Sequence, residues 1–303
     1  MTEIPSPLPG DFRSGYIAVI GKPNAGKSTL LNQLLQYKLS IVTRKPQTTR
    51  RNVIGIHNEP GAQAIFMDTP GLINPRYNLQ EAMMRQVQSA IKDADLILYL
   101  VDCADKLPAE ADIQAMLKPV ACPVILGFNK IDLIDRRKLL PLIETFGKLY
   151  PFRTIIPLSA EKNDGVDQLL REVVKNLPQG PPYYPSDYIT DQQERFFVAE
   201  IIREKIFKFY GQEVPYATHV DIEEFKEREN GKVYVRAVIF IERDSQKSII
   251  IGKKGQALKK VGQLARQEIE VFLDRPIFLE LFVKVSADWR KQEAQLRRMG
   301  YLR

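Results

Sequence analysis

Short apolar runs alternate with longer amphipathic stretches between residues 16 and 178, and no other feature constrains the fold as strongly. Several runs are continuously apolar, as in strands that helices cover on both faces. The predicted strands are 16–21, 52–57, 64–68, 96–101, 124–129 and 154–158, and the predicted helices are 27–36, 78–92, 107–117, 138–149 and 167–176. The pattern predicts an α/β domain with a mostly parallel six-stranded sheet, whose one antiparallel strand comes from a hairpin turning at Glu59-Pro60-Gly61.

A proline-dense stretch from Leu177 to Pro185 ends this alternation. Because neither a helix nor a central strand tolerates such a run, we interpret 179–190 as an interdomain linker. Beyond it, the patterns predict a helix at 191–210, strands at 214–224 and 232–242 around an Asn230-Gly231 turn, a helical pair within 248–273, a strand at 277–285 and a charged helix at 287–299. The expected organisation is a tail (1–15), an α/β domain (16–178), the linker and a smaller α+β domain (191–303).

Composition excludes several classes of protein. With two cysteines and two histidines in 303 residues, the chain has neither a disulfide framework nor a plausible Cys/His zinc site. No apolar leader precedes residue 16, and the longest apolar run, 96–101, is far too short to span a membrane, so we expect a cytoplasmic protein. The net charge of +7 favours a polyanionic partner, although it also fits charge that serves solubility alone.

The first predicted strand leads into a phosphate-binding loop. The sequence Gly21-Lys22-Pro23-Asn24-Ala25-Gly26-Lys27-Ser28, followed by Thr29, fits GxxxxGK[ST] and enters a predicted helix. Glycines let backbone N–H groups surround a phosphate, and the helix N-terminus adds its positive dipole end. Lys27 is expected to neutralise the β- and γ-phosphates, and the Ser28 hydroxyl to ligate Mg²⁺. The alternative is a glycine-rich turn that merely caps a helix.

Two further strand ends carry the remaining nucleotide contacts. Asp68-Thr69-Pro70-Gly71-Leu72 places a carboxylate where it can hold Mg²⁺ and a glycine N–H within reach of a γ-phosphate. Asn129-Lys130-Ile131-Asp132 follows the fifth strand, and a carboxylate such as Asp132 can accept both donors that distinguish guanine from adenine. Asn129 either bonds the base or ties loops together, the Lys130 stem can cover the purine, and Ser159-Ala160 can offer an N–H to guanine O6. Together the motifs favour GTP and GDP over ATP.

These segments, in this order, resemble the translation-factor class of P-loop GTPases, and GxPNxGKS with Gln47-Thr48-Thr49-Arg50 and DTPGL resembles the bacterial Era family over nearly the whole chain. The resemblance implies a P-loop NTPase G domain and a switch threonine within Thr48-Thr49 that closes on Mg²⁺ and the γ-phosphate. Thr49 is the preferred choice, which makes Lys27, Thr49 and Gly71 the expected catalytic residues and Ser28, Thr49 and Asp68 the expected metal ligands.

One residue departs from the Ras-like pattern. Ras-like enzymes place a water-orienting glutamine directly after the DxxG glycine, whereas this chain has Leu72. We therefore expect slow intrinsic hydrolysis, with the water positioned by backbone, by a cation or by a partner. As in some relatives with an asparagine in the phosphate loop, we hypothesise that Asn24 helps to hold a K⁺ ion.

The second domain carries an IGxxGxxL signature between helical segments. Two glycines permit close approach of a sugar–phosphate backbone, which is the logic of a KH GXXG loop, and the predicted element order resembles the type II KH fold. Between residues 245 and 267 six side chains are basic and none is acidic. The expected RNA-binding residues are Ile251, Gly252, Lys253, Lys254, Gly255, Leu258 and Lys259. The alternative is a solvated helix–turn–helix, and single-stranded RNA is the expected ligand.

The prediction that follows is a GTP-hydrolysing RNA-binding switch. The family resemblance implies the 3′ end of 16S rRNA as its RNA, a role in 30S subunit assembly, and loose association with the cytoplasmic face of the membrane. We expect a monomer. Two alternatives stay open: an RNA-binding assembly factor without significant hydrolysis, and an ATP-dependent enzyme. A second basic stretch, Lys38, Arg44, Lys45, Arg50 and Arg51, either contacts RNA or is a solvated loop.

Overall fold

The computed structural model describes residues 11–43, 45–228 and 231–302, and it divides into two compact units. The first extends to Asp191, and the second begins at Gln192. Two short segments from the first half of the chain, Ile41–Thr48 and Asn74–Met83, group with the second unit. The first ends at Thr48, directly before the expected switch residue Thr49, and the second follows the Asp68–Leu72 motif.

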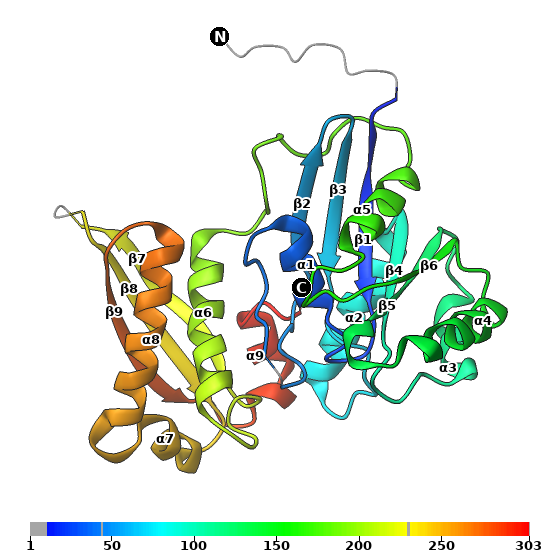
Figure 1. Cartoon of the computed structure of the whole chain (residues 1–303). Coiled ribbons are helices and arrows are strands. Elements are labelled where there is room, and N and C mark those ends of the chain that lie inside the picture. Colours follow the sequence, from blue (N-terminus) through cyan, green and yellow to red (C-terminus); the bar gives the residue numbers. More distant parts are fainter. Residues whose placement is uncertain (1–10, 44, 229–230, 303) are drawn as a thin grey trace, which may run out of the picture. The chain divides into compact units, whose positions relative to one another are not determined.

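The first unit contains a six-stranded sheet in the order β2-β3-β1-β4-β5-β6 (Figure 1). Its strands are β1 (Arg13–Ile20), β2 (Val53–Glu59), β3 (Ala62–Asp68), β4 (Leu96–Asp102), β5 (Val124–Asn129) and β6 (Thr154–Pro157). Only β2 runs antiparallel, paired with β3, so the predicted hairpin and parallel sheet are confirmed. Since β1 lies between β3 and β4, the chain crosses over in opposite directions on its two sides, which opens a crevice at the carboxyl ends of these strands.

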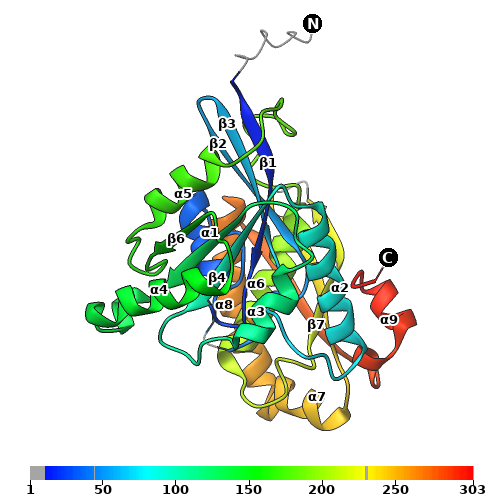
Figure 2. The same cartoon turned by 90° about the vertical axis from the view of Figure 1, so that its right-hand side faces the viewer.

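Helices cover both faces of this sheet, which explains why its strands are continuously apolar. They are α1 (Lys27–Leu35), α2 (Asn78–Asp93), α3 (Glu110–Leu117), α4 (Leu139–Leu149) and α5 (Val166–Lys175), with single 3₁₀ turns at Ile131–Leu133 and Arg136–Lys138. Figure 2 shows α1 and α5 on one side of β1–β3, and α2 and α3 on the other. Ala18, Leu126 and Phe128 from the strands share one core with Val87 of α2 and Phe146 of α4.

The second unit packs helices against one face of a three-stranded sheet, ordered β7-β8-β9. Its main elements are α6 (Glu194–Phe209), β7 (His219–Glu227), β8 (Val233–Ile241), α7 (Asp244–Ile251), a 3₁₀ turn (Lys253–Gly255), α8 (Gln256–Leu273), β9 (Ile277–Val285), a 3₁₀ turn (Trp289–Lys291) and α9 (Glu293–Arg298). Residues Ile202, Val235, Ile250 and Ile269 form part of one buried core. The predicted α-β-β-α-α-β order is thus confirmed.

Several element boundaries differ from the sequence prediction; β1, for example, begins at Arg13, within the predicted tail 1–15. The strand predicted from residue 214 begins at His219, because Ala217 N–H donates to Glu213 O and closes a turn first. The helix predicted from 107 begins at Glu110, after extended backbone at Ala109. The C-terminal helix is split, since Gln292 has extended dihedral angles between the two helical pieces. In the predicted Asn230-Gly231 turn, Asn230 lies outside the described residues.

The proline-rich segment is bonded to the first unit along its length. Gly180 N–H donates to Phe12 O at 3.0 Å, and Ile56 N–H of β2 donates to Ile189 O at 2.8 Å. The fully buried Gln63 of β3 binds the middle of the segment: its Oε1 accepts the N–H groups of Tyr183 (2.7 Å) and Tyr184 (3.0 Å). We call residues 179–190 the strap. None of the described helices combines the length and apolar composition needed to cross a bilayer.

We predict that Gln63→Ala releases the strap. The substitution removes the acceptor of two partly buried N–H groups of the strap, which should lower the free energy of unfolding by about 1–3 kcal/mol. Chymotrypsin should then cleave faster after Tyr183 or Tyr188. Gln179→Ala, which changes an exposed glutamine in the same segment, should leave the cleavage rate unchanged. Equal rates for both variants would contradict the role assigned to Gln63.

Candidate functional site

The predicted phosphate loop joins the end of β1 to the start of α1. Gly26 precedes the helix with φ of +95°, in the left-handed region that favours glycine. A Cβ atom at this position would lie only 2.1 Å from Asn129 Nδ2. Gly26 is therefore required both by its backbone conformation and by the close approach of the Asn129 loop.

Lys27 is folded over this loop and is 6% exposed. Its Nζ donates to Gly21 O at 3.0 Å and to Lys22 O at 3.1 Å. Burial lowers the pKa of Lys27 to about 8, although the nearby Asp68 carboxylate opposes this shift. The hydrogen bonds of this buried ammonium go to neutral carbonyl groups. A phosphate in this loop would therefore stabilise the charged form of Lys27.

Three oxygen-bearing side chains converge next to Lys27. Ser28 Oγ donates to Asp68 Oδ2 at 2.8 Å, and Thr49 Oγ1 lies 3.0 Å from Ser28 Oγ and 3.3 Å from Asp68 Oδ2. Asp68 is fully buried, and burial raises its pKa while Lys27 and the hydroxyl hydrogen bonds oppose the change. Its Oδ1 has no hydrogen-bond partner among the described residues. Hard oxygen donors with a spare buried carboxylate atom fit Mg²⁺.

The expected metal ligands are therefore brought together, and Thr49 rather than Thr48 contributes the hydroxyl. Thr48 instead accepts a hydrogen bond at its main-chain oxygen from Arg203 Nη2, at 2.5 Å. Thr48 and Arg203 both belong to the second unit. The preference for Thr49 that came from the family resemblance agrees with this geometry.

The segment from Asp68 to Leu72 lies directly against the phosphate loop. Leu72 N–H donates to Gly21 O at 3.0 Å, and Thr69 Oγ1 donates to Val19 O at 2.7 Å. A Cβ at Gly71 would lie 2.7 Å from Pro23 N. A larger residue at position 71 would therefore push the two loops apart. The leucine at position 72 carries no group that can orient a water molecule.

Asn129 connects three loops at the predicted base end. It is 2% exposed; its Nδ2 donates to Ala25 O at 2.8 Å and its Oδ1 accepts Ala160 N–H at 2.9 Å. Of the two roles considered for Asn129, the structure shows the loop-tying one. Asp132 lies exposed in the 3₁₀ turn that follows β5, where its carboxylate is open to a ligand.

Sequence reasoning missed Asp102, the last residue of β4. Its Oδ2 lies 2.5 Å from Lys130 Nζ, an ion pair that fixes the lysine stem expected to cover the purine. The signal was present, because Asp102 is a polar residue at a strand's carboxyl end, like Asp68 and Asn129. In the second basic stretch, Arg50 is buried at 4% exposure and Lys45 Nζ donates to Phe207 O, so neither is a solvated side chain. Arg44 lies outside the described residues.

The GXXG segment forms the turn between α7 and α8. Gly252 and Gly255 have φ of +70° and +77°, and Lys254 between them is also left-handed. The lysines Lys253 and Lys254 are exposed. Of the three isoleucines before the loop, Ile250 is fully buried in the core while Ile249 is half exposed, which leaves Ile251 at the loop edge.

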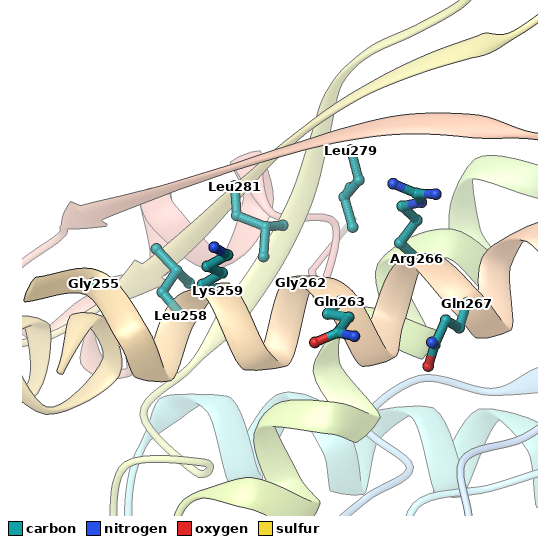
Figure 3. Close-up of a pocket in the computed structure, with 9 residues that line it drawn as sticks. All are labelled: Gly255, Leu258, Lys259, Gly262, Gln263, Arg266, Gln267, Leu279 and Leu281. Atoms are coloured by element: carbon teal, nitrogen blue, oxygen red, sulfur yellow. The ribbon is translucent and has the colours of Figure 1, made fainter.

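A groove of about 610 Å³ continues from this turn between α8 and β9 (Figure 3). Gly255, Leu258 and Lys259 line it, as expected of RNA-binding residues. Six further lining residues were not predicted: Gly262, Gln263, Arg266, Gln267, Leu279 and Leu281. The last two face the groove because side chains on β9 alternate between its two sides. An apolar floor with basic and amide rims suits the faces and edges of unstacked bases.

Comparisons with known proteins match both units. The family of 50S ribosome-binding GTPases matches residues 16–130, and the KH domain family matches residues 213–290. The chain is 51% identical to GTPase Era of Geobacter sp. (strain M21) over 96% of this chain and 98% of that protein, and 43% identical to GTPase Era of Lactobacillus delbrueckii subsp. bulgaricus over 95% and 96%.

Two solved structures match the fold over 96% of this chain and all of the other, each with a TM-score of 0.92 and 42% identity. One is an Era variant of Aquifex aeolicus bound to GDP.AlF4-, and the other is Era with MgGDPNP and nucleotides 1506-1542 of 16S ribosomal RNA. Because the sequence identity and the structural match both extend over nearly the full chain, this protein belongs to the Era family of GTPases, with a G domain followed by a KH domain.

Proposed function

We propose that the chain hydrolyses GTP slowly and uses the nucleotide state to control binding of single-stranded RNA at the 3′ end of 16S rRNA. The observation that carries this proposal is the convergence of Lys27, Ser28, Thr49 and Asp68 at one end of the crevice, with Asn129 and Asp132 at the other. Phosphate groups, a metal ion and a base each find the donor or acceptor chemistry that they need.

At the phosphate end, some residues would bind the phosphates and others would ligate the metal ion. The loop N–H groups and Lys27 would bind the β- and γ-phosphates and offset charge on the transferred group. Ser28 and Thr49 would ligate Mg²⁺ directly, and Asp68 would hold it directly or through water; the ion supplies further charge neutralisation when bound. Gly71 would offer its N–H to the γ-phosphate. Loss of that phosphate removes the contacts that hold Thr49 and Gly71, which loosens both segments.

Hydrolysis must proceed without a glutamine after Gly71. Because Leu72 cannot orient water, we propose slow intrinsic turnover in which backbone groups, and a K⁺ ion held in part by Asn24, replace it. The relative bound to GDP.AlF4- carries the nucleotide product with a fluoroaluminate group at an Era site, which supports hydrolysis as the reaction.

Two observations support an RNA partner: the KH groove of this chain, and the relative whose structure was solved with nucleotides of 16S rRNA. We propose that the same RNA region binds here, that the cellular role is assembly of the 30S subunit, and that the protein acts as a cytoplasmic monomer with loose membrane association. The chemistry of the groove by itself supports single-stranded RNA as the ligand class.

The deciding experiment measures phosphate release from GTP by the full chain, alone and with a single-stranded 16S 3′-end oligomer, in K⁺ and in Na⁺ buffers. We expect slow release that is faster in K⁺. Equal rates in the two buffers would remove the role of K⁺. No release under any condition would favour the alternative, an RNA-binding assembly factor that has lost hydrolysis.

Asp132→Asn tests guanine recognition. An amide can no longer accept both guanine donors, so affinity for GTP should fall at least tenfold while affinity for xanthosine triphosphate rises. Equilibrium titration with GTP, XTP and ATP measures the change. Asp135→Asn is the matched control, because Asp135 is exposed in the same loop and pairs with Arg137 instead. Unchanged GTP affinity, or ATP bound as well as GTP, would favour the ATP-dependent alternative.

Lys253→Glu and Lys254→Glu test the RNA site. Each replaces a phosphate-neutralising cation in the GXXG turn by an anion, which should lower RNA affinity by tenfold or more without changing GTP affinity. Filter binding with a labelled single-stranded oligomer measures this loss. Lys291→Glu makes the same charge change at an exposed lysine outside the groove and should have little effect. RNA binding by the two loop variants equal to that of this control would remove the RNA-binding role proposed for the GXXG turn.

A further inference from the structure

A second hollow, of about 500 Å³, lies on the α6 side of α8. Its lining residues are Lys205, Lys208, Phe209, Leu264, Gln267 and Glu268. Gln267 lines this hollow and also the groove between α8 and β9. Figure 3 shows the amides of Gln263 and Gln267 pointing away from Leu279 and Leu281. The two hollows therefore meet at Gln267 on α8, and an RNA strand that crosses α8 at this residue passes from one to the other.

The hollow presents an aromatic ring that is held in place. Phe209 is 46% exposed, and its ring packs edge-on against Tyr210, with centroids 5.2 Å apart and planes at 73°. Tyr210 is itself fixed, because its hydroxyl donates to Ile250 O at 2.5 Å. An exposed ring that is already ordered gives a stacking surface without a large loss of side-chain entropy on binding.

Charge in the hollow is balanced, unlike charge at the GXXG turn. Lys205 pairs with Glu268 and lies 3.6 Å from Glu204, and Lys208 pairs with Glu204 at 2.8 Å. Together with Glu204, which is buried beneath the lining residues, the two cations meet two anions, so the net attraction for a phosphate is small. The Gln267 amide and the Glu268 carboxylate nevertheless offer donors and acceptors beside the ring. This chemistry suits an uncharged nucleobase better than a phosphate group.

We propose that this hollow is a nucleobase subsite for RNA that extends beyond the KH groove, with Phe209 stacking on the base and Gln267 contacting its edge. The proposal rests on RNA binding by the groove and adds a longer binding footprint to it. A KH groove holds about four nucleotides, so the subsite would be reached only by a longer strand.

The test compares two labelled oligomers bound to the full chain: a tetramer, and a dodecamer with the same four central nucleotides extended at both ends. Wild-type protein should bind the dodecamer more tightly. Phe209→Ala should leave tetramer affinity unchanged and weaken dodecamer binding about 5- to 100-fold, the loss expected for one base–aromatic stack. Phe209→Trp should keep dodecamer affinity. Fluorescence anisotropy measures both, and thermal melting checks that the variants fold.

Phe278→Ala is the matched control, because Phe278 is 49% exposed on β9 and does not line either hollow. It should change neither affinity. If wild-type protein binds neither oligomer, the proposal that the groove binds RNA is wrong, and so is the proposal of the subsite. If wild-type protein binds both but Phe209→Ala weakens them equally, or weakens neither, the RNA groove stands and the subsite is wrong.

Discussion

The buried amide of Asn129 is the interaction on which the nucleotide site depends. One end of this side chain bonds the phosphate loop at Ala25 O, and the other accepts the N–H of Ala160. Three loops that follow three different strands are thereby held at fixed separations. Since the contact also requires a glycine at position 26, the sequence of the phosphate loop and that of the base-binding loop constrain each other. The distance between the two ends of the site is set by protein bonds before any ligand arrives.

At the phosphate end, burial of the charged side chains of Lys27 and Asp68 has an unfavourable electrostatic free energy, which a bound ligand can reduce. Lys27 is buried against carbonyl groups, and burial lowers its pKa. Asp68 is buried with one oxygen lacking a hydrogen-bond partner among the described residues. A polyphosphate with a divalent cation supplies the missing opposite charge to each side chain at once. Affinity for the complete nucleotide–metal pair is therefore expected to exceed what either component gains alone.

The sequence predicted the fold well because its signals were local. Continuous apolar runs located every strand of the first sheet to within a few residues, and glycine and proline marked most turns. The phosphate loop, Asp68 and the GXXG turn were also found, since each is a contiguous motif. Contacts between distant segments were harder to predict. Neither the ion pair of Asp102 with Lys130 nor the groove residues Leu279 and Leu281 follow from spacing, because they depend on which strands become neighbours.

The strap has a consequence for how this chain behaves among other proteins. Strand β2 lies at one margin of the six-stranded sheet, where an unpaired backbone invites a foreign strand to add on. Ile189 O accepts a hydrogen bond from the N–H of Ile56, and Thr190 Oγ1 donates to Ile54 O. The segment thus shields Ile54 and Ile56 on the β2 margin from edge-to-edge pairing with another protein.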